Sequence, residues 1–311
     1  MVIKMKRFIY ALLFIGIAFG AYFYRDEIID FVLTNVIQKD EDSLEYKNSY
    51  YLKYSFGFVK NLNEIKLEKK KDIVNLYYSI INNGNDTFKF YCPKKYKTCL
   101  DDVDFLANDQ TELSIINGYV HPYNSFDTIE TTYDALGKVE LKINKIYSQE
   151  KIELINSKVD QIVKEQVNGV EDKREIIRII HDYIIENTKY DKERTDKNII
   201  NYESNTAYGV LYQGYGICSG YADTMAIFLN YYDIPNFKIA SENHVWNAVY
   251  LDDQWLHLDL TWDDPVLSTG EEIVDDSYFL ITTEELKAKP DDTEHNYNKE
   301  TYSELETKAK A

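Results

Sequence analysis

The chain has 311 residues, 53 of them Asp or Glu and 35 Lys or Arg, which gives a formal net charge of −18. Its composition, 44% hydrophobic and 28% charged, is that of a globular protein and excludes wholesale disorder, and its length suffices for one large domain or two smaller ones. The acidic balance argues against nucleic acid as the main partner, because phosphate binding requires clustered Lys and Arg.

Residues 8–24 form an uncharged apolar run of 17, close to the shortest length that spans a bilayer. Three basic residues precede it: Lys4, Lys6 and Arg7. By the positive-inside rule, residues 1–25 are a cytoplasmic tip and a single-pass transmembrane anchor, and the rest of the chain lies outside. The small-x-small triplet at 18–20 leaves open a cleaved signal peptide and a secreted protein. A third interpretation is a buried helix of a soluble domain.

The region after the apolar run is predicted to be a tether followed by a small α+β unit. Residues 26–45 are polar and acidic, as in a tether, and residues 46–150 hold the α+β unit. Within it, residues 87–92 alternate like a strand, and residues 126–148 are typical of a hairpin. Its role stays open between positioning a substrate, covering the site as a lid, and spacing the rest of the chain from the membrane.

The three cysteines favour an oxidising compartment. Cys92 and Cys99 enclose a loop of six residues and are expected to form a small disulfide outside the cell. Neither a second cysteine pair nor a nearby histidine completes four ligands, so no metal site is expected. Cys218 is left over, and its surroundings must decide whether it is a buried thiol or a reactive one.

From residue 151 the hydrophobic period becomes helical. Residues 151–167 and 171–188 are predicted helices, and residues 189–202 a surface loop near the site. A glycine-rich loop, a helix at 218–231 and a strand hairpin at 244–260 follow. A domain at 151–285 is therefore expected, and residues 286–311 are expected to be an acidic C-terminal tail that frays.

Cys218 has the surroundings of a nucleophile. Gly214, Gly216 and Gly220 flank it and would let a substrate approach the main chain closely. An apolar repeat after Cys218 starts a buried helix that ends near Pro235. At a helix N-terminus, unpaired N–H groups and the dipole stabilise a thiolate. The alternative is a buried cysteine in a helix contact.

A histidine and an acid follow on a strand hairpin. If the hairpin turns at residues 252–253, His244 opposes Thr261, and Asp259 is its diagonal neighbour on the same face, roughly 7–8 Å away between backbones. A carboxylate can reach across that gap to one imidazole nitrogen, which aims the other nitrogen toward Cys218. A register slip of one residue would turn Asp259 to the opposite face.

Three sequence blocks resemble the signature blocks of the transglutaminase-like superfamily, in the same order. They are GYGICSGYA, NHVWNAV and WLHLDLTWDDP, and they cover about residues 170–265. The resemblance implies an α+β, papain-like core, in which a cysteine at a helix start packs on an antiparallel sheet. It also implies thiol-dependent acyl transfer or hydrolysis at amide bonds of proteins or peptides, with no cofactor. With an exported, anchored domain, cell-surface proteins or cell-wall peptides are the expected substrates. The rival is a non-catalytic binding or scaffold module that retains the fold.

The resemblance assigns roles to single residues. It makes Cys218 the nucleophile, His244 the general base and acid, and Asp259 the orienting carboxylate. The oxyanion-stabilising side chain is not matched securely: Gln213 and Tyr208 are equal candidates, and the backbone N–H of Cys218 is a third donor.

The remaining polar and aromatic residues receive lesser roles. Trp246 and Trp262 are expected to wall the site and to shield the His–Asp contact from water. Asp263 belongs to a turn and is the rival for the acid role. The other histidines are interpreted as structural or as lacking partners: His121, His181, His257 and His295.

Overall fold

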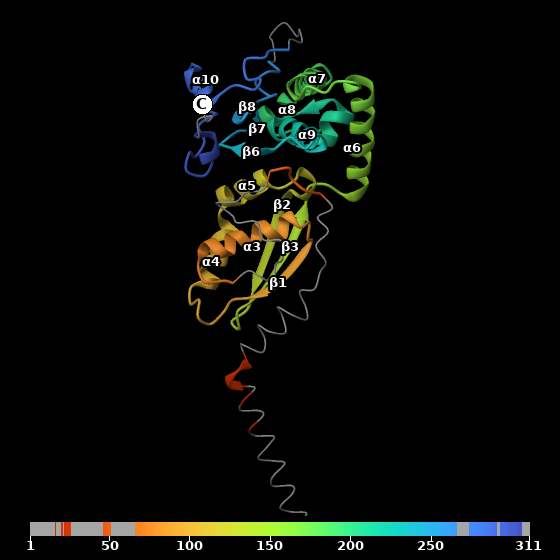
Figure 1. Cartoon of the computed structure of the whole chain (residues 1–311). Coiled ribbons are helices and arrows are strands. Elements are labelled where there is room, and N and C mark those ends of the chain that lie inside the picture. The colour runs from red at the N-terminus through yellow and green to blue at the C-terminus, as the bar shows by residue number, and fades with distance from the viewer. Residues whose placement is uncertain are drawn as a thin grey trace, which may run out of the picture.

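The computed structural model describes residues 16, 20, 22–25, 46–50, 66–265, 274–290 and 293–306. The expected tether lies outside these residues, and so does most of the expected anchor at 8–24. Among the described residues, no helix is both long enough and apolar enough to cross a bilayer. The described chain forms two lobes stacked along the long axis of the molecule (Figure 1).

In the N-terminal lobe, helices pack over a three-stranded antiparallel sheet with strand order β1–β3–β2 (Figure 1). Its elements are α3 (Lys70–Asn82), β1 (Thr87–Tyr91), α4 (Cys99–Asn108), α5 (Gln110–Tyr119), the short 3₁₀ turn η3 (Pro122–Asn124), β2 (Phe126–Tyr133) and β3 (Lys138–Lys145). The predicted strand at 87–92 and the predicted hairpin at 126–148 are confirmed. Cys92 and Cys99 form a disulfide between the end of β1 and the start of α4.

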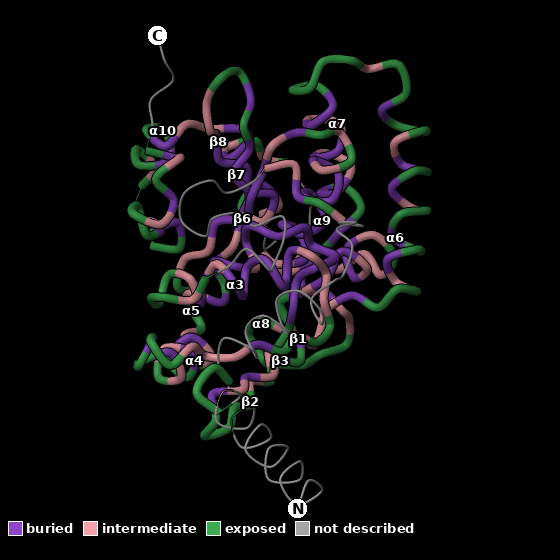
Figure 2. Tube along the Cα trace, turned by 60° about the horizontal axis from the view of Figure 1, so that its bottom comes forward, coloured by how far each residue is buried: buried purple, intermediate pink, exposed green. Residues whose placement is uncertain are grey.

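A buried helix, α9 (Cys218–Tyr231), runs through the C-terminal lobe and packs on an antiparallel sheet of order β6–β7–β8. The strands are β6 (Asn236–Ala240), β7 (Val245–Leu251) and β8 (Gln254–Leu258). Every residue of α9 from Gly220 to Leu229 is buried, and in Figure 2 this helix and its sheet form the densest buried region. A helix that is buried on all sides is typical of the centre of a domain.

The other elements of this lobe surround that centre. Two amphipathic helices, α6 (Gln149–Ile162) and α7 (Lys173–Glu186), confirm the helical period, and Ser148 and Asp172 cap their N-termini by accepting backbone N–H bonds. The shorter elements are η4 (Val163–Val167), β4 (Lys189–Tyr190), α8 (Lys192–Lys197), η5 (Gly209–Gln213), β5 (Tyr215–Gly216), α10 (Thr283–Ala288) and η6 (Ser303–Glu306).

A two-residue turn fixes the register of the β7–β8 hairpin. Asp252 and Asp253 both have positive φ, 51° and 60°, as the tightest hairpin turn requires. Leu251 therefore pairs with Gln254, as predicted. Continuing this register past the strand ends places the residues just after β8 opposite those just before β7.

The β6–β8 sheet separates two apolar cores. Alternate residues such as Val249 and Leu256 face the core that contains α9, while Phe237 and Trp246 face a core shared with the N-terminal lobe. The N-terminal lobe is therefore joined to the sheet through a common core. Close packing of α5 on β6 needs Gly118, since a Cβ there would lie 2.5 Å from the Lys238 carbonyl oxygen.

The end of the chain differs from the expected fraying tail. Tyr297, Tyr302 and Leu305 are buried in the core shared by the two lobes. The backbone N–H of Ala240 donates to the Tyr302 hydroxyl at 3.0 Å, which attaches this segment to β6. Residues 293–306 pack as they do because these side chains bury apolar surface despite the acidic residues between them.

Replacing Gly118 with alanine should destabilise the protein. The added methyl would overlap a backbone carbonyl, which cannot rotate aside, so we expect the free energy of unfolding to fall by about 1–3 kcal/mol despite the better helix propensity of alanine. Ser114→Ala, at an exposed position of the same helix, is the control and should change it by less than about 0.5 kcal/mol. Denaturant titrations measure both, and equal midpoints would contradict close α5–β6 packing.

Candidate active site

Cys218 occupies the first position of α9, directly after the extended residue Ile217. No side chain caps this helix end, so its first backbone N–H groups and the positive end of its dipole remain available to stabilise negative charge on the sulfur. Cys218 is half-buried and lines a cavity of about 320 Å³. The nucleophile predicted from the sequence is therefore accessible.

His244 and Asp259 meet at the mouth of the hairpin. His244 directly precedes β7, Asp259 directly follows β8, and the imidazole Nε2 lies 2.6 Å from the carboxylate Oδ2. Since an ionised carboxylate only accepts, Nε2 donates, and Nδ1 is left for the sulfur. His244 lines the same cavity as Cys218, and the two side chains interact electrostatically. The structure thus brings the three predicted residues together.

The electrostatics of the site favour an ion pair. Burial alone would lower the pKa of His244, but the charge and hydrogen bond of Asp259, together with Cys218, outweigh it and raise that pKa to about 10. Burial also tends to raise the pKa of Asp259, yet His244 and His295 hold it well below its ordinary value. At neutral pH the His244 ring is therefore an imidazolium, paired with the Asp259 carboxylate.

His295 was missed from the sequence, where it had no evident partner. Its Nε2 lies 2.7 Å from Asp259 Oδ2, and its side chain is 3% exposed. It belongs to the terminal segment 293–306, which was expected to fray. Because the chain reaches Asp259 from a region without regular secondary structure, no spacing in the sequence indicates this contact.

Aromatic rings enclose the His–Asp pair. The indole of Trp246 stacks on the His244 ring, with centroids 5.6 Å apart, and is fully buried. Its Nε1 donates to Nδ1 of His257 at 3.0 Å, which gives His257 a packing role. Trp262 is half-exposed, contacts the His295 ring and donates to Glu294. Trp246 thus lies against the imidazole, and Trp262 lies farther out, beside His295.

Neither side-chain candidate for the oxyanion role lines the cavity. The Gln213 Oε1 accepts from the backbone N–H of Glu203 at 2.7 Å, and Tyr208 stacks on the ring of Tyr212. Both side chains hold the loop before Cys218 in place. Of the three donors expected from the sequence, the backbone N–H of Cys218 is the one that belongs to a residue lining the cavity.

Of the three glycines around Cys218, Gly214 has a positive φ of 71°, whereas Gly216 and Gly220 serve internal packing, in contrast to the expectation that they admit substrate. A Cβ on Gly216 would lie 2.6 Å from the ring of Tyr221, and one on Gly220 would lie 2.2 Å from the Ser204 carbonyl oxygen. Their missing side chains make room for the protein's own atoms, which seat the start of α9 against the preceding loop.

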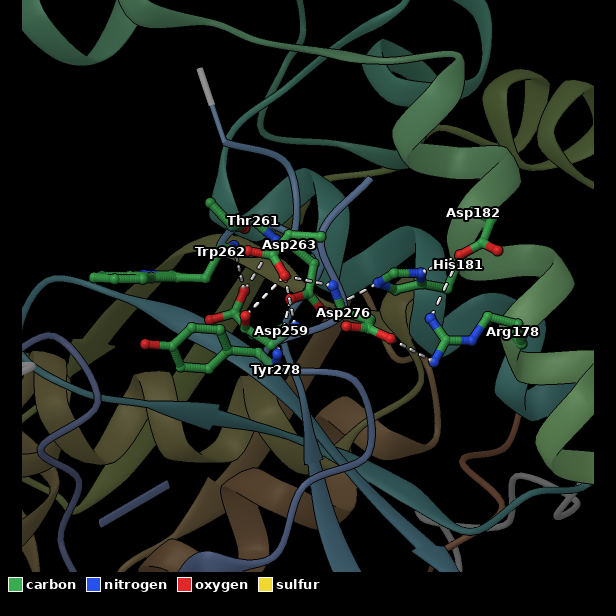
Figure 3. Close-up of polar contacts among 11 residues, drawn as sticks. Arg178, His181, Asp182, Asp259, Thr261, Trp262, Asp263, Asp276 and Tyr278 are labelled. Carbon is green, nitrogen blue, oxygen red and sulfur yellow. Dashed lines mark hydrogen bonds and ion pairs between the residues drawn. The ribbon is translucent and has the colours of Figure 1, made fainter. Parts of the chain in front are cut away.

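The rival acid, Asp263, is directed away from His244. Its Oδ2 lies 3.1 Å from Nε2 of His181 on α7, and its Oδ1 accepts from the backbone N–H of Tyr278 (Figure 3). Burial raises the pKa of Asp263 to about 6, although the hydrogen bonds oppose this. His181 also contacts Asp182. This buried pair fixes the loop after Asp259 against α7.

Among the described residues, His244, Asp259 and His295 are the group whose ligand atoms could surround a metal ion, all lying within 4.8 Å of one another. Both imidazole Nε2 atoms already lie at hydrogen-bond distance from the same oxygen. A metal would have to displace both bonds, so the three groups fit a hydrogen-bonded unit better than a metal site.

Both lobes contribute to the cavity. Its N-terminal side includes three residues of α5: Ser114, Asn117 and Gly118. Its C-terminal side includes the segment 240–245 and the buried ion pair of Lys238 Nζ with Asp223 Oδ1 at 2.5 Å. The hydroxyl of Tyr147 donates to the second oxygen of Asp223. The N-terminal lobe is thus one wall of the cavity that Cys218 faces.

Residues 160–260 match the family model of the transglutaminase-like superfamily, and this segment contains Cys218, His244 and Asp259. The segment 160–260 is therefore transglutaminase-like, and the part of the chain that contains it is called the transglutaminase-like domain below. The resemblance drawn from the three sequence blocks is confirmed. A crystal structure of a TGase is similar at 15% sequence identity with a TM-score of 0.33; the match covers 44% of this chain and 44% of that one, so the chain spans less than half of its length. No curated protein matches the chain.

His257 should make the stability of the transglutaminase-like domain depend on pH. Burial lowers the pKa of His257 to about 3, whereas a histidine of the unfolded chain titrates near 6.5. Its contribution is therefore present above pH 6.5 and is lost as the pH falls toward 3. The free energy of unfolding should fall more steeply in the wild type than in His257→Gln, by up to about 1.4 kcal/mol per pH unit. Denaturant titrations between pH 7 and pH 5 measure this, and parallel curves would contradict it.

Proposed function

We propose that the transglutaminase-like domain transfers acyl groups from amide bonds through a thioester on Cys218. The observation that carries this proposal is that Cys218 and His244 line one cavity, while Asp259 is hydrogen-bonded to the His244 ring from behind. Nucleophile, acid–base group and orienting acid are the parts that such catalysis requires.

The residues act in two half-reactions. The Cys218 thiolate attacks the amide carbonyl carbon, and the resulting oxyanion accepts from backbone N–H at the start of α9. As the C–N bond breaks, the His244 imidazolium gives its Nδ1 proton to the leaving amine. Neutral His244 then takes a proton from water or from a second amine, which attacks the thioester and releases the thiolate. Asp259 keeps its charge throughout and holds the ring in the required tautomer.

The acceptor decides the outcome. Water gives proteolysis or deamidation, and a primary amine gives a cross-link. Serines and asparagines of both lobes predominate around the cavity, and its apolar side chains are few. These walls suit a polar peptide segment better than a large apolar side chain. We propose proteins or peptides of the cell surface or cell wall as substrates.

The same proposal places the domain outside the cytoplasm. Basic residues before the apolar run at 8–24 favour a single-pass anchor with the N-terminus inside, and the Cys92–Cys99 disulfide favours an oxidising compartment. A secreted form after signal cleavage is the alternative, and it leaves the chemistry of the site unchanged.

Thiol alkylation tests the ion pair without knowledge of the substrate. Iodoacetamide should modify Cys218 near neutral pH at least about tenfold faster than an ordinary thiol, because an imidazolium stabilises the thiolate. His244→Ala should remove most of this advantage. His121→Gln, at a buried histidine outside the cavity, is the control and should leave the rate unchanged. If Cys218 is alkylated at the rate of an ordinary thiol, and His244→Ala does not change that rate, this mechanism is excluded.

Turnover separates an enzyme from a binding module. Glutamine-containing peptides, incubated with and without a fluorescent primary amine, should yield ammonia or a labelled adduct, and Cys218→Ala should abolish both. Asp259→Asn should lower kcat by about 10²–10⁴-fold. Asp263→Asn, the matched control, should cost far less because that carboxylate faces His181. The reverse ranking of the two acids would contradict the assignment of Asp259.

A further inference from the structure

The Asp259 carboxylate accepts four hydrogen bonds, which come from three places in the chain. Oδ1 accepts from the backbone N–H groups of Thr261 at 2.9 Å and of Trp262 at 3.3 Å (Figure 3). Oδ2 accepts from the imidazoles of His244 at 2.6 Å and of His295 at 2.7 Å. With both oxygens engaged on two sides, the carboxylate can neither rotate nor exchange its oxygens between partners.

Aromatic rings hold the His295 imidazole in a fixed orientation. It stacks on Tyr278, with centroids 4.9 Å apart, and meets the indole of Trp246 edge-on at 4.8 Å. Trp262 lies 5.3 Å away on another side. The ring is therefore aimed at Asp259 by packing, and its Nε2 faces an oxygen that is already bonded to His244.

We infer that His295 is a positioning residue for the reaction, acting through Asp259. Its Nε2–H occupies the part of Oδ2 that His244 leaves open, so the carboxylate stays oriented when the His244 proton moves. No bond to His295 forms or breaks in the reaction. This inference rests on the proposed function and deepens it, since it adds a second histidine to the triad.

The hydrogen bond, separate from the packing, is what the inference requires. His295→Phe keeps an aromatic ring in the enclosure but removes the donor. His295→Gln removes the ring but places an amide N–H where Nε2 stands. A purely structural role predicts that the aromatic replacement is the milder change, whereas a positioning role predicts that the amide is milder.

The test measures iodoacetamide alkylation of Cys218 in the full-length protein, per folded molecule, with folding checked by denaturant titration. We expect His295→Phe to slow alkylation about 10–100-fold, as losses of outer hydrogen-bond partners do at other sites, and His295→Gln to stay within about threefold of the wild type. His121→Phe, a buried histidine outside the cavity, controls for the replacement itself and should leave the rate unchanged.

Two results would overturn the inference: a wild-type rate in His295→Phe, or equal slowing in the Phe and Gln variants. If His295→Phe does not fold, ¹⁵N-histidine spectra of the wild type test the inference instead, because a His295 ring that donates to Asp259 must carry a proton on Nε2. An unprotonated Nε2 refutes the inference, and a protonated Nε2 supports it. If Cys218 of the wild type is alkylated at the rate of an ordinary thiol, the proposed function is refuted instead. The spectra would then still show whether His295 donates a hydrogen bond to Asp259.

Discussion

The site depends on keeping one carboxylate ionised in the interior. Asp259 is 1% exposed, and an isolated charge at that depth would take up a proton. Two imidazoles prevent this: against the effect of burial, His244 and His295 hold the pKa of Asp259 below its ordinary value, while two backbone N–H groups donate to its other oxygen. The charge retained there keeps His244 an imidazolium.

That carboxylate is positioned by the β6–β8 sheet, on which both lobes pack. The tight turn at Asp252 and Asp253 sets the register that brings His244 and Asp259 together. One face of the sheet packs on α9, which carries Cys218, and the other packs on the N-terminal lobe. A change in the packing on either face of the sheet would therefore alter the distance between the Cys218 sulfur and the His244 imidazole, although neither core contains a reacting atom.

Local pattern sufficed for the elements that carry the triad. A helical period after Cys218 and strict alternation on either side of residues 252–253 predicted α9 and the hairpin, because one face of each strand is buried. The same reasoning failed to predict the packing of residues 293–306, because the charged residues between Tyr297, Tyr302 and Leu305 obscure any apolar period there. It also misjudged Gly216 and Gly220, since only the fold shows which atoms fill the space beside a glycine. The partner of His295 is 36 residues away and in no regular register, so no local rule could find it.

The terminal segment has a consequence for biosynthesis. Cys218 leaves the ribosome well before His295 and before the tyrosines that cover the open face of the sheet. A nascent chain that stops short of residue 293 would lack one of the four donors to Asp259, and Trp246 would lose the His295 ring packed against it. Assembly of the hydrogen-bonded unit is thus deferred until residue 295 has been made, so a shorter nascent chain carries a thiol whose supporting groups are still incomplete.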